Sequence, residues 1–436
     1  MPSSTAPRIL LVGGGYVGLY AALRLERRLR PAEADLTLVS PENFMVYQPL
    51  LPEVASGTLE PRHAVVPLRQ ALRRTRLVTG RLEALDHPGR VATVAPNDGP
   101  ARELPYDHVV LGLGSMTRVL PIPGVAERAV GFQTVTEAIH LRNHVLARLE
   151  VAEATDDERV RRRALTFVFV GGGYTGVEAL AELEDMARAS CDAFTRVRPA
   201  DLRWVLVEAT DGILPTVEPG LAAHALRTLR SRGIEVHLET TLESAEDGRM
   251  RLSTGVEVEA DTLVWMAGIR PQALTGELGL PVDDSGRLVV DSELRVAGTG
   301  GAWAAGDSAA VPDPGGGHYP PTAQHAQRAA RRLADNLVAT LRDEPLRPFR
   351  HDSLGELVTL GRYKGVASMR GLELRGFLPW LLRRLYYVVQ VPTVNRKLRI
   401  VVDWLVGIPF RREIVSLGSL EDPRLPIDRA ARETGG

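Results

Sequence analysis

Two short apolar runs, each followed at once by glycines, stand out in the pattern of hydrophobic and polar positions along the chain. The first is ILLV at 9–12, and the second is LTFVFV at 165–170. A continuous apolar run of this length is typical of a strand buried on both faces of a parallel sheet. A helix-forming segment follows each group of glycines. The pattern therefore predicts two strand–turn–helix units of the same kind.

Both turns have the spacing G-x-G-x-x-G. The glycines concerned are Gly13, Gly15 and Gly18 in the first unit and Gly171, Gly173 and Gly176 in the second. Glycine tolerates positive φ and lets the backbone approach a pyrophosphate closely. The helix N-terminus that follows offers free N–H groups and the positive end of the helix dipole. One such motif is weak evidence, but two in one chain predict two bound dinucleotides and electron transfer between them.

The second strand of a dinucleotide-binding unit usually ends in an acid that binds ribose hydroxyls. In the second unit, LRWVLVE at 202–208 ends in Glu208. This carboxylate would repel a 2′-phosphate, so NADH is favoured over NADPH; the alternative is a surface glutamate at a strand end. In the first unit the same position is Ser40, and either its hydroxyl or Glu42 is a candidate for the ribose contact.

Two further strands resemble each other and repeat the same order of landmarks. They are YDHVVLGLGS at 106–115 and ADTLVWMAGIRP at 260–271, the latter including Gly268. Each is expected to close one nucleotide domain, and the repetition argues for internal duplication. The predicted fold class is α/β, with two Rossmann-like dinucleotide-binding domains, the second inserted in the first. The predicted divisions are 1–118 with 272–345, then 119–271, then 346–436.

Three other segments admit more than one interpretation. FMVYQPLLPEVAS at 44–56 is either a loop and short helix packed on the sheet or a wall beside a flavin ring. GGAWAAGDSAAV at 300–311 places Asp307 at the end of a small-residue strand, where it either caps the next helix or binds a polyol hydroxyl. The charged segment 137–163 is interpreted as a helix with a mostly solvated face.

The C-terminal part changes character between 361 and 412, where eleven basic residues and two acidic ones give a net charge of +9, against −1 for the whole chain. The basic residues are Arg362, Lys364, Arg370, Arg375, Arg383, Arg384, Arg396, Lys397, Arg399, Arg411 and Arg412. Apolar and aromatic residues alternate with them. This composition is typical of a helix lying on an anionic membrane surface; the alternative is an amphipathic pair covering a core or a dimer interface. Arg383 and Arg384 interrupt the apolar run, which argues against a membrane span.

Composition narrows the function further. A length of 436 residues suits two or three domains, and the net charge of −1 does not indicate a nucleic-acid partner. The single cysteine, Cys191, excludes an internal disulfide and a dithiol relay. We expect no signal peptide, because no apolar run precedes the strand at 9–12. The ten histidines are scattered, so no metal site is predicted.

Taken together, the motifs resemble a known family. GGGYVGLYAALRL, GGGYTGVEALAEL, VYQPLLPEVASG, AAGDSA, PPTAQHA and the basic tail are similar to those of the type II NADH:quinone oxidoreductases, flavoproteins that do not pump protons. The resemblance extends from about residue 8 to about residue 417. It implies FAD as cofactor, NADH as substrate and a quinone of the menaquinone or ubiquinone class as acceptor. It also implies a bacterial respiratory role, a peripheral position on the cytoplasmic face of the cell membrane, and a homodimer.

The resemblance also implies roles for individual residues. FAD would be held by Gly13, Gly15, Gly18 and Asp307, with Tyr47, Gln48, Pro49, Ala323 and Gln324 near its ring. NADH would be held by Gly171, Gly173, Gly176, Glu208 and Gly268. Glu178 corresponds to the family's glutamate near nicotinamide and flavin, although an acid stabilised by the first turn of a helix is the alternative. Gln324 would also lie close to the quinone.

The family's quinone motif, A-Q-x-A-x-Q, is present with one departure. Ala323, Gln324 and Ala326 fit it, but the last position is Arg328, and Gln327 is one residue early. On a helix, neighbouring residues point about 100° apart, so Gln327 does not replace the missing glutamine. Arginine would either stabilise a reduced quinone anion or select another acceptor.

Three rival functions remain to be weighed. A disulfide- or sulfide-linked flavoenzyme needs at least two cysteines near the flavin, which the single Cys191 does not provide. A soluble diaphorase with a non-quinone acceptor would fit Arg328. A non-catalytic nucleotide sensor would keep FAD as structure. Reduction of bound flavin by NADH, followed by trials of different acceptors, would separate them.

Overall fold

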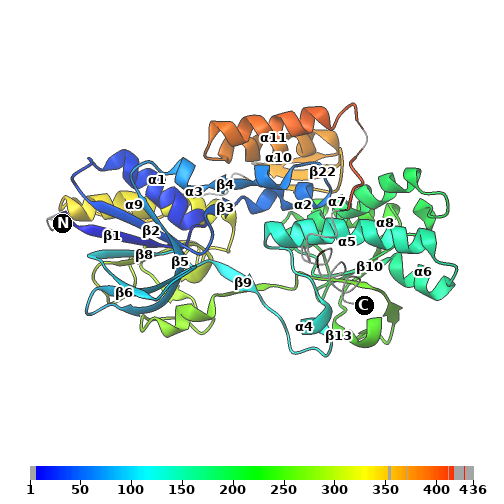
Figure 1. Cartoon of the computed structure of the whole chain (residues 1–436), viewed down its shortest axis with the longest axis horizontal. Coiled ribbons are helices and arrows are strands. Elements are labelled where there is room, and N and C mark those ends of the chain that lie inside the picture. Colours follow the sequence, from blue (N-terminus) through cyan, green and yellow to red (C-terminus); the bar gives the residue numbers. More distant parts are fainter. Residues whose placement is uncertain (1–5, 352–354, 370, 411, 417–426, 428–436) are drawn as a thin grey trace.

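The molecule is built around two mainly parallel sheets, and each sheet forms the centre of one half of the molecule (Figure 1). The computed structural model describes residues 6–351, 355–369, 371–410, 412–416 and 427. Arg370 and Arg411 of the basic window lie outside these residues. The fold class is the α/β class predicted from the sequence.

The first sheet carries the first glycine turn. Its strands are β1 (Arg8–Val12), β2 (Asp35–Ser40), β5 (Arg76–Asp86), β6 (Val91–Pro96), β7 (Arg102–Pro105), β8 (His108–Leu111) and β19 (Ala302–Ala304). They are ordered β19-β8-β1-β2-β5-β6-β7, and only the β5–β6 and β6–β7 pairs are antiparallel. Helices α1 (Tyr16–Arg28) and α9 (Ala323–Leu341) pack against each other on it. The apolar run of the sequence is therefore the central, buried strand β1.

The second sheet repeats this plan on a smaller scale. Its strands are β10 (Thr166–Val170), β11 (Arg203–Val207), β12 (Glu235–His237) and β16 (Thr262–Trp265), all parallel, in the order β12-β11-β10-β16. Helix α7 (Tyr174–Ser190) follows β10, and α8 (Pro219–Ser231) precedes β12. Phe167 and Phe169 of β10 contact the ring of Trp204 on β11. The second apolar run is again a central strand.

The charged segment at 137–163 differs from its prediction. It forms two helices, α5 (Val135–Ala154) and α6 (Glu158–Ala164). Helix α5 buries Leu141, Val145 and Leu149 on one side, so it is part of the core rather than a mostly solvated helix. Three arginines of α6, Arg159, Arg161 and Arg163, pair with acids of the neighbouring strands and loops.

The chain passes between the two sheets through a two-stranded ribbon. Strand β9 (Ser115–Thr117) runs out to the second sheet, and β17 (Ile269–Pro271) returns antiparallel to it. In Figure 1, β9 lies between the two halves of the molecule. The division into domains near these residues stays a prediction.

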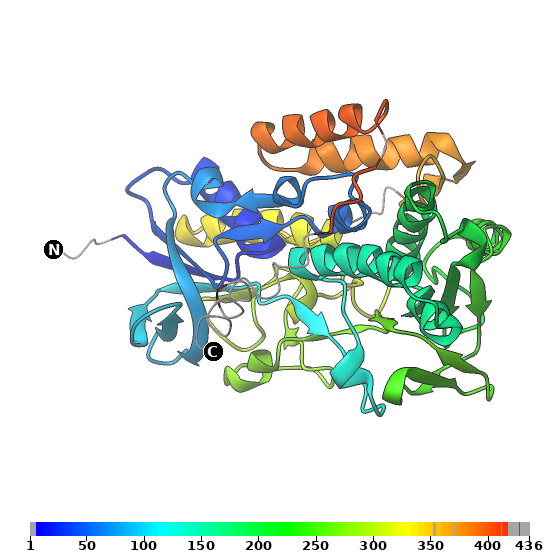
Figure 2. The same ribbon diagram turned by 45° about the vertical axis from the view of Figure 1, so that its right-hand side comes forward.

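The C-terminal part adds a small antiparallel sheet and two helices. The sheet has β21 (Glu356–Thr359), β22 (Gly365–Met369) and β23 (Leu372–Arg375), and the helices are α10 (Phe377–Gln390) and α11 (Val394–Val406). The two helices lie side by side along one edge of the molecule, above both halves (Figures 1 and 2). Among the described residues, no helix is both long enough and apolar enough to cross a membrane.

Candidate functional site

The two glycine turns have almost the same geometry. Gly13 has φ +102° and Gly171 has φ +114°, a region that side chains disfavour. A Cβ atom on Gly18 would lie 1.9 Å from the carbonyl oxygen of Gly13. A Cβ on Gly176 would lie 2.0 Å from the carbonyl oxygen of Gly171. At all four positions the turn therefore requires glycine.

Open space faces the N-terminus of each helix that follows. A Cβ atom on Gly15 or on Gly173 would meet no atom within 4 Å. Neither α1 nor α7 has a side chain that caps its first N–H groups. Free donors, a positive dipole end and room for a ligand thus coincide at both places, and this arrangement fits the pyrophosphate of a dinucleotide.

Glu208 and Ser40, which follow or end the second strand of each unit, contact the two glycine turns in different ways. Glu208 accepts a hydrogen bond from the N–H of Gly172 at 2.6 Å and another from the N–H of Thr210 at 2.9 Å. The carboxylate is therefore held beside the second glycine turn, as a ribose-binding acid requires. In the first unit, Ser40 is buried, and its Oγ would lie 2.3 Å from a Cβ atom on Gly14. A small hydroxyl thus occupies the position that a carboxylate holds in the second unit.

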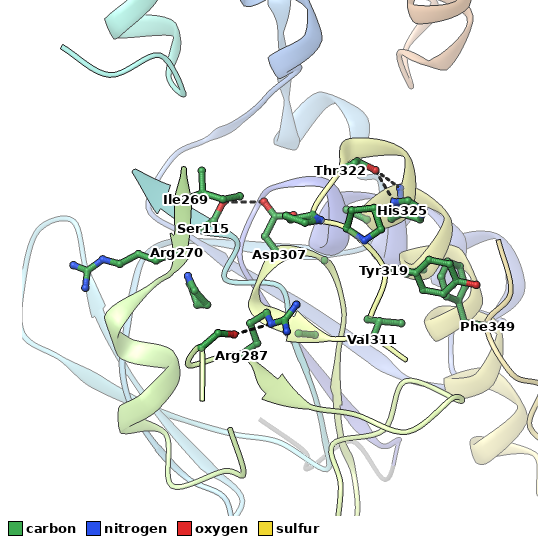
Figure 3. A pocket seen from close by; sticks show the side chains of 18 of the residues that line it. Ser115, Ile269, Arg270, Arg287, Asp307, Val311, Tyr319, Thr322, His325 and Phe349 are labelled. Atoms are coloured by element: carbon green, nitrogen blue, oxygen red, sulfur yellow. Dashed lines mark hydrogen bonds between the residues drawn. The ribbon is translucent and has the colours of Figure 1, made fainter. Parts of the chain in front are cut away.

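Asp307 faces a cavity beside the first sheet. It lies within the short 3-10 helix Gly306–Ser308, and Thr322 caps the next helix, α9, so the capping interpretation is wrong. One carboxylate oxygen accepts a hydrogen bond from Ser115 Oγ at 2.8 Å (Figure 3). The cavity has a volume of about 480 Å³ and is also lined by Tyr319 and His325. Burial raises the pKa of Asp307, and the Ser115 hydrogen bond offsets part of that rise. A carboxylate in this setting suits a hydroxyl-bearing ligand.

Aromatic contacts connect the segment at 44–56 to the first glycine turn. Tyr47 is buried, and its ring lies 5.8 Å from that of Tyr16 and 6.1 Å from that of Tyr387, measured between ring centroids. Tyr16 directly follows Gly15, and its hydroxyl is buried without a hydrogen-bond partner among the described residues. Tyr47 is therefore close to the place where the first dinucleotide would lie.

The neighbouring predicted residues have separate settings. Gln48 is exposed and donates a hydrogen bond to the carbonyl of Gln133, whereas the carbonyl of Pro49 accepts one from Arg383. Ala323 and Gln324 are half-buried at the start of α9. Gly268 has φ +100° and open space beside it, at the point where the chain enters the ribbon.

Glu178 is buried in an ion pair that the sequence analysis did not foresee. Its carboxylate accepts hydrogen bonds from the Nη2 of Arg383 at 2.8 Å and from the N–H of Thr359 at 2.8 Å. It lies in the second turn of α7, so the first-turn interpretation is wrong. Burial raises the pKa of Glu178, and the Arg383 guanidinium offsets part of that rise. The residue thus belongs to a contact between α7 and the C-terminal helices.

This ion pair extends into a buried network. Arg383 also lies 3.3 Å from Glu53, whose other oxygen accepts a hydrogen bond from Trp404 Nε1 at 2.6 Å. Arg384 lies 3.7 Å from Glu53 and stacks between the rings of Trp380 and Trp404. Arg383 and Arg384 are therefore internal, which corrects their place in the predicted basic surface.

Comparisons with known proteins bear on this arrangement. The family of pyridine nucleotide-disulphide oxidoreductases matches residues 7–330. NdhA, a type II NADH:quinone oxidoreductase of Mycobacterium tuberculosis, is 30% identical over 426 residues, covering 92% of this chain and 87% of that protein. This chain belongs to the type II NADH:quinone oxidoreductase family. The demethylphylloquinone reductase NdbB of Synechocystis is also 30% identical, covering 92% of this chain and 96% of that one.

Solved structures show the same fold. The NDH2 of Plasmodium falciparum, in complex with NADH, has a TM-score of 0.87 at 18% identity, covering 94% of this chain and 99% of that one. The prediction of a two-dinucleotide oxidoreductase with FAD as cofactor and NADH as substrate is confirmed. Within the broader disulphide oxidoreductase family, a single buried cysteine, Cys191, separates this chain from members that use a dithiol.

The departure from the family's quinone motif has a defined structural setting. Gln327 is buried and donates a hydrogen bond to Gln390 Oε1 on α10 at 3.2 Å. Arg328 is half-buried and lies 3.3 Å from His351 Nε2. The two residues thus point to different neighbours, as their helical spacing predicts. The sequence motif identified Arg328 as the departure from the family pattern, but it could not predict the contact between Arg328 and His351.

Proposed function

We propose that this chain transfers electrons from NADH through FAD to a membrane quinone without pumping protons. The observation that carries the proposal is the pair of matching glycine turns, each with open space at a helix N-terminus. FAD, when bound, supplies the chemistry of accepting a hydride from NADH and reducing a quinone by two electrons. The protein's residues bind and orient the two partners.

In this proposal each predicted residue has one role. Gly13, Gly15 and Gly18 bind the FAD pyrophosphate, Ser40 lies at its ribose, and Asp307 binds its ribityl hydroxyls. Tyr47, Gln48, Pro49 and Ala323 lie beside the flavin ring. Gly171, Gly173, Gly176 and Gly268 hold NADH, with Glu208 on its ribose. Glu178 lies near the reacting rings and Gln324 near the quinone.

We infer that the acceptor is a quinone of the menaquinone or ubiquinone class. NdhA and NdbB, by their names, act on quinones. The start of α9, with Gln324, and α10, with Tyr387, would flank the quinone. Arg328 takes the place of the family's second glutamine, and its fixed charge suits the developing negative charge of a reduced quinone.

We also infer a peripheral position on the cytoplasmic face of the membrane. Large apolar side chains are exposed along α10 and α11, and an exposed apolar surface of this kind needs a partner. They are Phe377, Leu378, Leu385, Val389, Val394, Leu398, Val401, Val402, Leu405 and Val406. An anionic lipid surface would cover them and attract the remaining basic residues. A homodimer through the same region is the alternative cover.

Anaerobic titration of the purified protein with NADH tests the redox proposal. We expect NADH to bleach the bound flavin, and a menaquinone or ubiquinone analogue to restore its absorbance. Bleaching without recovery by any quinone would favour the diaphorase with another acceptor. A flavin that NADH leaves oxidised would make the protein a nucleotide-binding protein without catalysis.

A further inference from the structure

Ser115 takes part in two features of the fold, the cavity that contains Asp307 and the β9–β17 ribbon. Its hydroxyl donates a hydrogen bond to Asp307 Oδ2 at 2.8 Å, inside the cavity beside the first sheet (Figure 3). Its backbone is the first position of the ribbon between the two sheets, where Ser115 pairs with Pro271. Its carbonyl oxygen also accepts a hydrogen bond from Gln272 Nε2 at 3.3 Å. One residue thus joins the half-buried carboxylate of Asp307 to the ribbon between the two sheets.

The carboxylate of Asp307 depends strongly on this hydroxyl. In the part of the chain that the structure describes, Ser115 is its one hydrogen-bond donor, and no cation forms an ion pair with it. The other carboxylate oxygen is left for a ligand in the cavity. A binding side chain keeps its geometry only when neighbouring contacts fix its rotamer. Ser115 provides that contact here.

The ribbon is short, so one anchored position matters. Each strand has three residues, and the pairs are Ser115 with Pro271, Met116 with Arg270 and Thr117 with Ile269. Anchoring the first pair to Asp307 fixes the end of the ribbon nearest the first sheet. A ligand that orders Asp307 would therefore order this end as well.

We propose that Ser115 positions Asp307 for the ribityl hydroxyls of FAD, and that this hydrogen bond couples flavin occupancy to the order of the interdomain ribbon. The inference rests on the proposed function, in which Asp307 binds the flavin. Ser115 is a positioning residue, because it acts through Asp307 and not on the reacting atoms. Without its hydroxyl, Asp307 has other rotamers and a weaker hold on the ribityl chain.

The first measurement is the rate of FAD release from the holoenzyme, followed as flavin fluorescence after dilution. Loss of one hydrogen bond to a charged group predicts roughly tenfold faster release in Ser115→Ala. Ser115→Thr keeps the hydroxyl and should release FAD at nearly the original rate. Ser115→Val has the same shape as threonine without the hydroxyl and should match alanine. Ser285→Ala is the control, because Ser285 lines the same cavity but bonds to Asp283.

The second measurement is hydrogen exchange of the ribbon amides at 115–118, 268–270 and 272, with and without bound FAD. We expect FAD to protect them in the original protein and in the threonine variant, and to protect them less in the alanine and valine variants. Equal release rates for threonine and valine, or equal protection in all variants, would overturn the inference.

A double-mutant cycle separates this inference from the proposed function. If Ser115 acts through Asp307, then Ser115→Ala adds little to the effect of Asp307→Asn on FAD release. Fully additive effects would mean that Ser115 acts elsewhere, and the inference would fail alone. An Asp307→Asn variant that retains FAD normally would instead remove Asp307 from the proposed flavin site.

Discussion

Arg383 of α10 donates a hydrogen bond from Nη2 to Oε2 of Glu178 on α7 at 2.8 Å, and its Nε lies 2.7 Å from Oε1 of the same carboxylate. Both side chains are buried. Arg383 also donates to the carbonyl of Pro49 at 2.7 Å and approaches Glu53. One guanidinium therefore connects residues of both nucleotide-binding halves to helix α10.

Loss of this guanidinium should destabilise the whole protein. In Arg383→Met, Glu178 and Glu53 would remain buried without their main cation. Removing one partner of a buried ion pair typically costs about 3–5 kcal/mol, because the other charge stays desolvated. We expect a clearly lower thermal unfolding temperature, measured on the flavin-loaded protein by circular dichroism.

A surface arginine provides the matched control for this variant. Arg375 pairs with Glu373 while nearly half of its side chain is exposed. Exposed pairs contribute about 0–1 kcal/mol, so Arg375→Met should unfold close to the original temperature. An equal fall in unfolding temperature in the two variants would show that the buried ion pairs of Arg383 contribute no more to stability than an exposed ion pair does.

The sequence predicts those parts of the fold that local pattern dictates. The apolar runs at 9–12 and 165–170 became the central strands β1 and β10, and the glycine spacing placed both turns correctly. These features depend on residues near one another in the chain. The tight turn also follows from the choice of glycine, because a Cβ atom at Gly18 would clash with the neighbouring backbone.

Ion pairs between residues far apart in the chain could not be predicted from the sequence. Arg383 and Arg384 interrupt the apolar run of α10. The sequence pattern assigned them to a basic surface facing anionic lipid, whereas the structure buries both side chains. Their acid, Glu53, lies 330 residues earlier in the chain. Nothing in the local sequence links the two segments, and only the packed structure brings them together.

The proposed role of Glu178 in catalysis can be tested apart from its role in packing. In Glu178→Gln we expect flavin reduction by NADH, or its reoxidation by quinone, to slow by about tenfold, which is a rise of about 1.4 kcal/mol in the activation free energy. Stopped-flow absorbance separates the two half-reactions. Glu182→Gln is the control, because Glu182 is buried one turn further along α7 and lies 3.8 Å from Arg412. An unchanged rate in Glu178→Gln would remove this residue from the mechanism.

Glu208 should set the preference for NADH over NADPH. Its oxygens are held by the N–H groups of Gly172 and Thr210, beside the second glycine turn. A 2′-phosphate would meet this carboxylate, whereas Glu208→Gln removes the charge that repels it. We expect kcat/KM to fall for NADH and to rise for NADPH relative to it. The exposed Glu257→Gln should leave the ratio unchanged, and an unchanged ratio in Glu208→Gln would place the specificity elsewhere.

The exposed face of α11 should bind the membrane surface. Leu398, Val402 and Leu405 are each more than half exposed. Replacing all three by serine removes apolar area without touching the buried side of the helix at Ile400. We expect the variant to lose sedimentation with anionic vesicles while NADH still bleaches its flavin. Val282→Ser, on the first nucleotide-binding half, is the control and should sediment normally; sedimentation of the triple variant would exclude this face as the contact.

Asp307 should cost stability when the flavin is absent, because burial raises the pKa of its carboxyl. A carboxyl group whose pKa is higher in the folded than in the unfolded chain stabilises the fold below its unfolded pKa. That contribution is lost as the pH rises through the folded pKa. At neutral pH, therefore, the ionised side chain disfavours the flavin-free fold.

Asp307→Asn removes this charge and keeps the shape of the side chain. We expect the flavin-free variant to unfold at a higher temperature than the original protein at neutral pH. The difference should shrink toward roughly pH 4, where an ordinary aspartic acid is already half-protonated. With FAD bound, the order should reverse, because the variant holds the ribityl hydroxyls less well. Thermal unfolding of both forms across this pH range provides the check, and a pH-independent difference would show that the carboxylate is not desolvated in the flavin-free protein.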